Sequence, residues 1–249
     1  MNRRSSVRLV AAALVMLGYG VTAQADKSLT FESGLQQTAL IELYTSEGCS
    51  SCPPADRWFS ELSGEQGLWT DYVPLAFHVT YWNYLGWRDG FSDEAYDQRQ
   101  RRRAAAADSG VYTPGVFLDG DEFRGWRRLR SGPSSSNSQA AGRLQVDVDQ
   151  GEIRATFDAQ TSAENLRVEV AVLSSGLTSK VRAGENRGRS LAHDFVVTSL
   201  TAVAMAREGE QWVARVDLPA TQDISRPALA VWVSDAQGEP LQATGGWLH

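Results

Sequence analysis

The sequence contains only two cysteines, Cys49 and Cys52, among its 249 residues. This number is too small for a disulfide-rich secreted scaffold, in which several cross-links compensate for a small core. The chain also lacks a Walker loop, a dinucleotide-binding fingerprint, a zinc-protease helix, a calcium loop and any internal repeat. Any chemistry must therefore concentrate at one point of the chain, and the cysteine pair is the first candidate.

Long apolar runs are also missing after the first 25 residues. None approaches the roughly 20 consecutive apolar residues that a membrane helix needs. The N-terminal segment is basic at residues 2–4, apolar at 9–21 and rich in small residues at 23–25, an order typical of a cleaved secretory signal. We therefore expect residues 1–25 to be a signal peptide, the protein to be periplasmic or secreted, and the mature form to have no membrane span.

Positive charge is scarce as well. The formal net charge is -6, and it becomes -9 when the three arginines of the signal peptide are removed. A chain this acidic lacks a basic stripe that could neutralise phosphates. Nucleic acid and anionic membrane surfaces are therefore not expected as partners.

The first half of the mature chain, residues 26–130, alternates between strand and helix patterns. The predicted strands are Thr38–Ser46 and Tyr72–Trp82, the predicted helices are Pro53–Leu62 and Ser92–Gly110 with Ser92 as a capping residue, and a hairpin follows at Gly115–Trp126 with its turn at Asp119-Gly120. A strand-helix-strand unit followed by a helix and a hairpin predicts an α/β domain.

The second half changes character after residues 131–142, a small and polar stretch that suits a linker. Residues 143–249 show a period of two, with a predicted turn at Gln150-Gly151. Several short strands at regular spacing predict a mostly-β sandwich domain. Only the pattern of residues 199–207 also fits a helix.

The two cysteines lie where the first predicted strand ends and the first predicted helix begins. Unpaired N–H groups at a helix N-terminus favour thiolate over thiol, and a pKa lowered from about 8.5 to about 7 would make about half of the molecules reactive at neutral pH. The spacing therefore predicts a thiol-disulfide oxidoreductase that acts on a protein or small-molecule thiol or disulfide. Cys49 would attack, and the more buried Cys52 would resolve the mixed disulfide.

Two other interpretations of the pair stay open. A structural disulfide is one, although closing so small a ring removes only about 2 kcal/mol of unfolded-state entropy in the chain-entropy model. A non-enzymatic copper(I)-binding or delivery module is the other, with Cys49 and Cys52 as thiolate ligands and His78 as the third ligand. In the redox interpretation no cofactor is expected. A lone strand histidine is more often packed or hydrogen-bonded than metal-bound.

Four segments in this order resemble the exported thioredoxin-like family catalogued as domain of unknown function 1223. They are LYTSEGCSSCPPAD, LAFHVTYWNYLGW, VYTPGVFLDG and AGENRGRSLAHDFVV. The resemblance implies an α/β thioredoxin-like N-terminal domain followed by a β-sandwich, but no established activity. It also implies that Pro114 follows a cis peptide bond, that it faces the cysteines, and that the Thr113 backbone aligns a substrate. The chain departs from the family pattern at Thr80 and Asn83, where acidic residues are common, so no carboxylate base is expected on that strand.

Two further features have two interpretations each. The aromatic residues Tyr81, Trp82, Tyr84 and Trp87 form either an apolar surface for a substrate polypeptide or part of the core. The polar segment from Glu185 to Asp194 is either an anion or peptide contact, with Arg187 as a bidentate carboxylate binder, or a turn held by a local Glu-Arg network.

Overall fold

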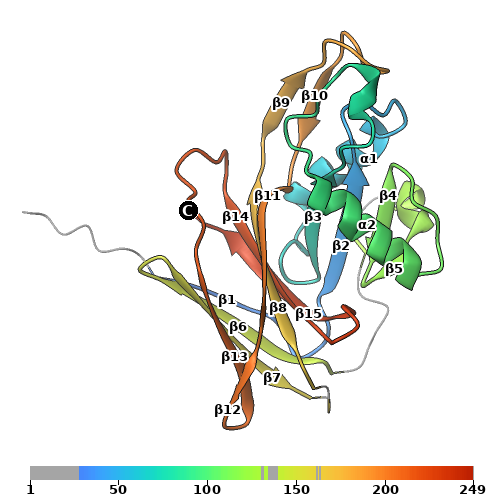
Figure 1. Ribbon diagram of the computed structural model, residues 1–249. Helices are drawn as coiled ribbons and strands as arrows, with labels where there is room; N and C mark the ends of the chain where they lie inside the picture. The colour runs from blue at the N-terminus through green and yellow to red at the C-terminus, as the bar shows by residue number, and fades with distance from the viewer. Residues whose placement is uncertain (1–27, 130–131, 134–139, 161, 163, 249) are drawn as a thin grey trace, which may run out of the picture.

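The computed structural model describes residues 28–129, 132–133, 140–160, 162 and 164–248. The predicted signal peptide lies outside the described residues, as do residues 131 and 134–139 of the predicted linker. Two α-helices are present in the described part of the chain, α1 (Pro53–Glu61) and α2 (Glu94–Ala106), together with three short 3-10 helices, η1 (Leu62–Gly64), η2 (Asn83–Leu85) and η3 (Arg124–Arg128). Most of the remaining structure is β-sheet (Figure 1).

The strands of the described residues form three sheets. The eight-stranded sheet has the order β15 (Pro240–Trp247), β14 (Ala228–Ser234), β8 (Arg167–Ser174), β11 (Val196–Ala204), β3 (Tyr72–His78), β2 (Ala39–Thr45), β4 (Gly115–Leu118) and β5 (Asp121–Glu122). The five-stranded sheet has the order β1 (Leu29–Glu32), β6 (Gly142–Asp149), β7 (Glu152–Ala159), β13 (Gln211–Asp217) and β12 (Ala206–Glu208). A separate hairpin pairs β9 (Leu177–Lys180) with β10 (Ser190–His193).

The predicted fold class, an α/β thioredoxin-like N-terminal domain followed by a sandwich, is wrong. Within the described residues, β2 to β5 do not form a sheet of their own, because β3 pairs in parallel with β11 through Ala76 and Val196. The sheet then continues through β8, β14 and β15. Conversely, β1 of the first half pairs with β6 of the second half. The fold is a mostly-β arrangement in which both halves of the sequence contribute to both large sheets.

Burial on two faces explains why local pattern did not reveal the shared sheet. All seven residues of β14 are buried, as are seven of the eight in β8. One face of β8 packs on the five-stranded sheet through Val168, Val170 and Val172, whereas Ala171 and Leu173 join the core around β2, β3 and α1. A strand covered on both sides gives a continuous apolar run, which carries no information about its partner strand.

The local elements are close to those predicted. Both helices and the two β-hairpins turning at Asp119-Gly120 and Gln150-Gly151 form within a few residues of their expected ends. Asp93 rather than Ser92 caps α2, since its carboxylate accepts a hydrogen bond from the N–H of Ala95. Residues 199–207 extend β11 and begin β12 instead of forming a helix, because β11 pairs along its length with β8.

The two α-helices lie on opposite faces of the central strands. Two residues of β2 an odd number of positions apart point to opposite faces of the sheet, and of these Glu42 contacts Arg99 of α2 whereas Thr45 donates a hydrogen bond to Asp56 of α1. The β9–β10 hairpin projects from the second half of the chain and packs against α1 (Figure 1). Among the described residues, none of the helices has the length and apolar character needed to cross a bilayer.

Candidate functional site

Cys49 and Cys52 form a disulfide in the turn that joins β2 to α1. Their Cα atoms are 5.5 Å apart, and Cys52 occupies the N-cap position of α1, directly before Pro53 and Pro54. Backbone hydrogen bonds close this turn from Cys49 N–H to the Ser46 carbonyl at 3.1 Å and from Cys52 N–H to the Cys49 carbonyl at 3.2 Å. The pair therefore lies at the strand-to-helix junction, where the sequence places it, and a proline at N1 leaves no N–H unpaired there.

Both cysteines are completely buried, with 0% of each residue exposed, while Ser50 and Ser51 between them are exposed. A difference in burial between an accessible Cys49 and a buried Cys52 is therefore not present. A bulky partner cannot reach a buried disulfide directly, so reaction depends on movement of the residues that cover it.

The cover comes from the loop between β9 and β10, more than 130 residues away in sequence. The Asn186 amide donates hydrogen bonds to the carbonyls of Cys49 at 2.8 Å and Glu47 at 3.0 Å. The Glu185 carboxylate accepts a hydrogen bond from the Ser50 N–H at 2.9 Å, and hydrogen bonding by the Ser50 side chain and backbone lowers the pKa of Glu185. A local Glu-Arg network was one of the two interpretations of this segment, but Glu185 and Asn186 instead tie the loop to the cysteine turn.

The Thr113–Pro114 segment lies on the other side of the cysteine turn. Its peptide bond is cis, as expected, and the Thr113 carbonyl accepts a hydrogen bond from the Ser51 hydroxyl at 3.4 Å. The same hydroxyl lies 3.3 Å from the Cys49 sulfur. Trp82 orients the segment, since its indole N–H donates to the Thr113 hydroxyl at 2.7 Å. The structure therefore brings Cys49, Cys52, Thr113 and Pro114 together.

A buried cluster of ionisable side chains lies behind the cysteine turn, and we call it the histidine cluster: Glu47, Asp56, His78, Asp89 and His193. His78 Nδ1 is 2.7 Å from an Asp89 carboxylate oxygen, and His193 Nε2 is 3.2 Å from a Glu47 carboxylate oxygen. The two imidazole rings meet edge to face with centroids 4.9 Å apart. The cluster thereby joins β3, the cysteine turn, α1 and β10.

Burial and pairing act in opposite directions on these groups. Burial alone would lower the pKa of His78, but the adjacent Asp89 carboxylate outweighs it and the pKa is raised. Burial would raise the pKa of Asp89, and His78 outweighs it, so the pKa is lowered. The pKa of Glu47 is also lowered, because contacts with His193, Ser179 and Trp87 outweigh its burial. Burial raises the pKa of Asp56 even though both histidines oppose it.

The sequence patterns pointed to His78 as a possible ligand and to His193 within the polar segment, but not to the three carboxylates of the histidine cluster. Glu47 and Asp56 lie two residues before Cys49 and four after Cys52, so their proximity to the motif was a usable signal. Asp89 and His193 come from a loop and from a strand of the second half. Only the three-dimensional pairing of these segments brings them to the site.

Comparison with known proteins identifies the family. A family model described as a protein of unknown function (DUF1223) matches residues 40–234. The chain belongs to this family. No curated protein matches the chain.

Two solved structures have a similar fold to this DUF1223 protein. The crystal structure of an Agrobacterium tumefaciens protein has a TM-score of 0.62 at 24% sequence identity, covering 86% of this chain and 94% of that one. HBP35 of Porphyromonas gingivalis has a TM-score of 0.56 at 12% identity, covering 86% of this chain and 76% of that one. Identities this low establish similarity of fold only.

In this DUF1223 protein, His78 contacts Asp89, Phe91 and His193. Among the residues that the structure describes, no group of three or more His, Cys, Asp or Glu side chains is placed to hold a metal ion. The copper(I) site of Cys49, Cys52 and His78 therefore stays a prediction from sequence, without support from the contacts of His78.

Most of the aromatic cluster is packed rather than free. Trp87 donates a hydrogen bond to Glu47 at 2.7 Å, Tyr81 donates to Gln100 at 3.1 Å, and Trp82 holds Thr113. Tyr84 is the exception, with 79% of the residue exposed. Packing is therefore the main role of this cluster, and one exposed ring remains beside the site.

The two positions at which the chain departs from the family pattern have polar partners. Thr80 binds the Asp97 carboxylate through its N–H and its hydroxyl, at 2.7 and 2.5 Å, and the Asn83 amide donates to the Ser92 hydroxyl at 3.1 Å. The carboxylates near the cysteines belong instead to Glu185 and to the histidine cluster.

Proposed function

We propose that this protein exchanges disulfides with a protein or small-molecule thiol in an exported compartment. The observation that supports the proposal is the position of the Cys49–Cys52 disulfide, at the N-terminus of α1 and beside the Thr113–Pro114 segment. Pro53 and Pro54 supply no N–H at this helix N-terminus, so the positive pole of α1 is what stabilises a thiolate in the turn.

The exchange has two steps in the direction that oxidises the protein. The Cys49 thiolate attacks a sulfur of the partner disulfide, the partner S–S bond breaks, and one partner sulfur leaves as a thiolate. The Cys52 thiolate then attacks the Cys49 sulfur, which closes the Cys49–Cys52 bond and releases the second partner thiolate. Two electrons pass from the protein to the partner. The reverse sequence reduces the protein, and the reduction potential of the couple sets the direction.

Burial of both sulfurs adds a condition to this mechanism. A partner sulfur must approach one cysteine along the axis of the S–S bond, and the β9–β10 loop covers that turn. Exchange with a bulky partner therefore requires the contacts of Glu185 and Asn186 with the cysteine turn to open. A small thiol needs a smaller opening and should react faster than a folded protein.

The test measures exchange in the folded protein. Oxidised protein is treated with dithiothreitol, and reduced protein with oxidised glutathione, while intact mass and near-UV circular dichroism are followed. Exchange with retention of fold is expected, with Cys52→Ser accumulating a mixed disulfide with glutathione on Cys49 and Cys49→Ser giving no productive cycle. The proposal fails if the disulfide is reduced only under conditions that unfold the chain.

Complete burial favours a second candidate, a disulfide that only stabilises the β2–α1 turn. Such a bond has a low reduction potential and does not turn over. Measurement of the potential against glutathione separates the two candidates, because a structural disulfide lies below about -300 mV and exchange-active couples lie above it.

A further inference from the structure

The tip of the β9–β10 hairpin concentrates positive charge in an acidic protein. Four exposed basic residues lie within ten positions: Lys180, Arg182, Arg187 and Arg189. We call them the basic tip. Glu185 is the one acidic residue of the same segment. The formal net charge of the whole chain is -6, so the sign at this place is opposite to that of the molecule.

The charges of the basic tip are free for a partner. Among the residues that the structure describes, none of the four forms an ion pair with an acidic side chain. Arg189 donates a hydrogen bond to the Asn186 amide oxygen at 3.0 Å, which is a neutral partner. Glu185 binds the Ser50 backbone and not an arginine.

The basic tip adjoins the disulfide. Glu185 and Asn186, within the same loop, bond directly to Ser50 and Cys49. A Cβ atom placed on Gly184 would stand 3.9 Å from the Cα of Gly48, which confirms close approach of the loop to the cysteine turn. A partner held by the basic tip therefore has its neighbouring residues close to Cys49.

The loop that presents these charges is held by its own hydrogen bonds. Val181 N–H donates to the Arg189 carbonyl at 3.0 Å, and Gly188 N–H donates to the Val181 carbonyl at 2.9 Å. Gly184 and Gly188 have φ values of +72° and +84°, which other residues adopt only with strain. A loop fixed in this way loses little conformational entropy when a partner binds.

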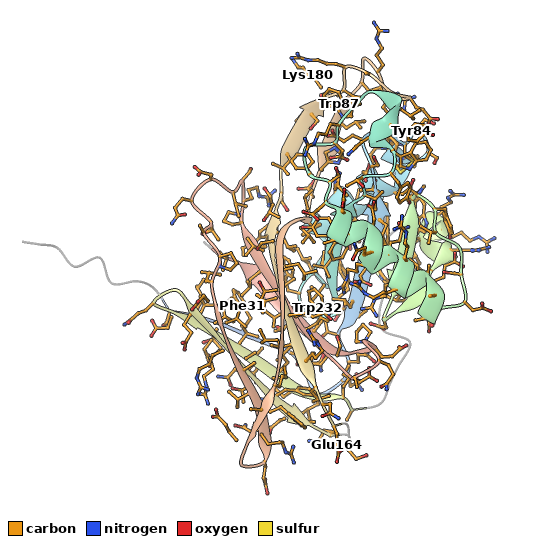
Figure 2. The ribbon with its side chains drawn as sticks, viewed as in Figure 1. Phe31, Tyr84, Trp87, Glu164, Lys180 and Trp232 are labelled. Atoms are coloured by element: carbon orange, nitrogen blue, oxygen red, sulfur yellow. A yellow bond between two sulfur atoms is a disulfide. The ribbon has the colours of Figure 1, made fainter. Side chains whose placement is uncertain are left out.

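One exposed aromatic ring, that of Tyr84, lies at the same end of the molecule as the basic tip. Figure 2 shows Tyr84, Trp87 and Lys180 at the same end of the molecule. A Cβ atom on Gly184 would be 3.6 Å from that of Trp87, so the loop that carries Tyr84 touches the hairpin. Arginine and tyrosine are enriched at protein interfaces, where the ring supplies contact area and the guanidinium binds carboxylates in a bidentate manner.

We propose that the basic tip binds an acidic polypeptide segment of the redox partner and so selects the protein whose thiol or disulfide meets Cys49. This inference rests on the proposed function. Charge complementarity favours carboxylates as the ligand, since four unpaired basic groups lie together on an otherwise acidic chain. An acidic polypeptide can supply both the carboxylates and a neighbouring sulfur, whereas an anionic lipid surface supplies no thiol.

The test uses binding and avoids cysteine chemistry. The probe is a fluorescent cysteine-free peptide rich in glutamate, compared with the same peptide carrying glutamine at those positions, and anisotropy is measured with the oxidised full-length protein. We expect the glutamate peptide to bind and the glutamine peptide not to bind. The double variant R182S/R187S should weaken binding about tenfold, with a weaker dependence on salt.

The matched control is R154S/R215S, which removes the same charge from the five-stranded sheet, where both arginines contact Glu208. Its affinity should match that of the unchanged protein within about twofold. Equal weakening in both double variants would overturn the proposal, because only net charge would then matter. Tighter binding to phosphatidylglycerol vesicles than to the glutamate peptide would also overturn it and would assign the surface to membranes.

Failure of peptide binding can be distinguished from failure of disulfide exchange, because the two are measured separately. Reduction of the unchanged protein by dithiothreitol tests exchange without the peptide, and the peptide tests the basic tip without a thiol. A reactive disulfide with no peptide binding overturns the basic tip alone. Peptide binding with an unreactive disulfide overturns the exchange chemistry alone and leaves a surface that binds acidic polypeptides.

Discussion

Two buried polar clusters lie on opposite faces of the same central strands, and their chemistry differs. Under α2, Arg99 contacts Glu42 at 2.5 Å and Glu169 at 2.6 Å, and Arg103 contacts Glu42 at 2.6 Å; we call this the arginine network. On the α1 face, the histidine cluster is built around two imidazoles. Both clusters join the two halves of the sequence, since Glu169 and His193 come from the second half.

The difference lies in what each cluster does when the pH changes. Arginine stays protonated throughout the ordinary range, and Arg99 is further enclosed between the rings of Phe77 and Trp232, 5.1 and 5.2 Å from its guanidinium carbon. Burial would raise the pKa of Glu42, but Arg103 and Arg99 outweigh it and the pKa is lowered. The arginine network thus keeps its charges near neutral pH, whereas the histidine cluster beside the disulfide contains His78, whose pKa is raised by the Asp89 carboxylate.

The largest expected effect comes from breaking the arginine network. Arg99→Met should lower the free energy of unfolding by about 3–5 kcal/mol, because Glu42 and Glu169 remain buried without their shared cation. Urea denaturation followed by tryptophan fluorescence measures the loss. The control is Arg102→Met on the same helix, where an exposed side chain is replaced and a change within about 0.5 kcal/mol is expected.

Equal stability of the two variants would contradict this assignment. It would mean that the carboxylates of the arginine network take up protons or water at little cost. The comparison would then be between two titratable clusters, and the pH behaviour described for the α2 face would be wrong.

The next largest effect is expected when the disulfide on the α1 face is removed. Cys49→Ser combined with Cys52→Ser should lower the free energy of unfolding by about 2 kcal/mol, because a four-residue ring restricts the unfolded chain only slightly. Reduction of the unchanged protein should cost a similar amount, measured by the same urea titration with and without dithiothreitol. Complete unfolding on reduction would show that the disulfide is chiefly a structural element of the β2–α1 turn.

Local features of the site were predictable from sequence. Cys49 and Cys52 follow an apolar strand and precede prolines, and this order fixes the helix that starts at Pro53. The cis bond before Pro114 and its place beside the cysteines were expected from the family resemblance. Such features depend on neighbours in sequence or on motif order, so no knowledge of the sheet was needed.

The sheet and the cover over the disulfide were not predictable in the same way. The seven buried residues of β3 look the same whether β3 is an edge or a central strand, so its pairing with β11 leaves no local trace. Asn186 reaches Cys49 only because this pairing places the β9–β10 hairpin above α1. Fold class and cover depend on the same long-range contact, and for that reason both were missed.

The third prediction concerns pH and separates the two clusters directly. The raised pKa of His78 contributes stability that is fully present below about pH 6.5 and is lost as the pH rises through the raised value. The lowered pKa values of Glu42 and Asp89 contribute stability present above about pH 4 that is lost only in acid. Unfolding free energies measured above neutral pH should therefore fall in the unchanged protein and show a flatter profile in His78→Gln.

A second measurement tests the raised pKa of His78 in the unchanged protein, so that the prediction does not depend on whether the His78→Gln variant folds. Proton NMR of the unchanged protein should give the imidazole of His78 a titration midpoint above that of a model peptide, and Asp89→Asn should lower that midpoint. A midpoint below the peptide value would show that burial outweighs the Asp89 carboxylate, and the sign of the pH dependence would then reverse.

The smallest expected effect concerns Glu185, whose carboxylate accepts a hydrogen bond from the Ser50 N–H at the surface beside the disulfide. Thiolates that attack the disulfide are anions, and the exposed Glu185 carboxylate lies beside their target. Glu185→Gln keeps an oxygen that can accept the hydrogen bond but removes the charge, so reduction by dithiothreitol should become about twofold to threefold faster at low salt, and the difference should shrink at high salt. The matched control is Glu164→Gln, which changes an exposed acid at the opposite end of the molecule (Figure 2).

If both variants are reduced at the same rate, repulsion between Glu185 and the attacking thiolate is not what limits reduction. Opening of the β9–β10 loop then remains as the step that controls access to Cys49.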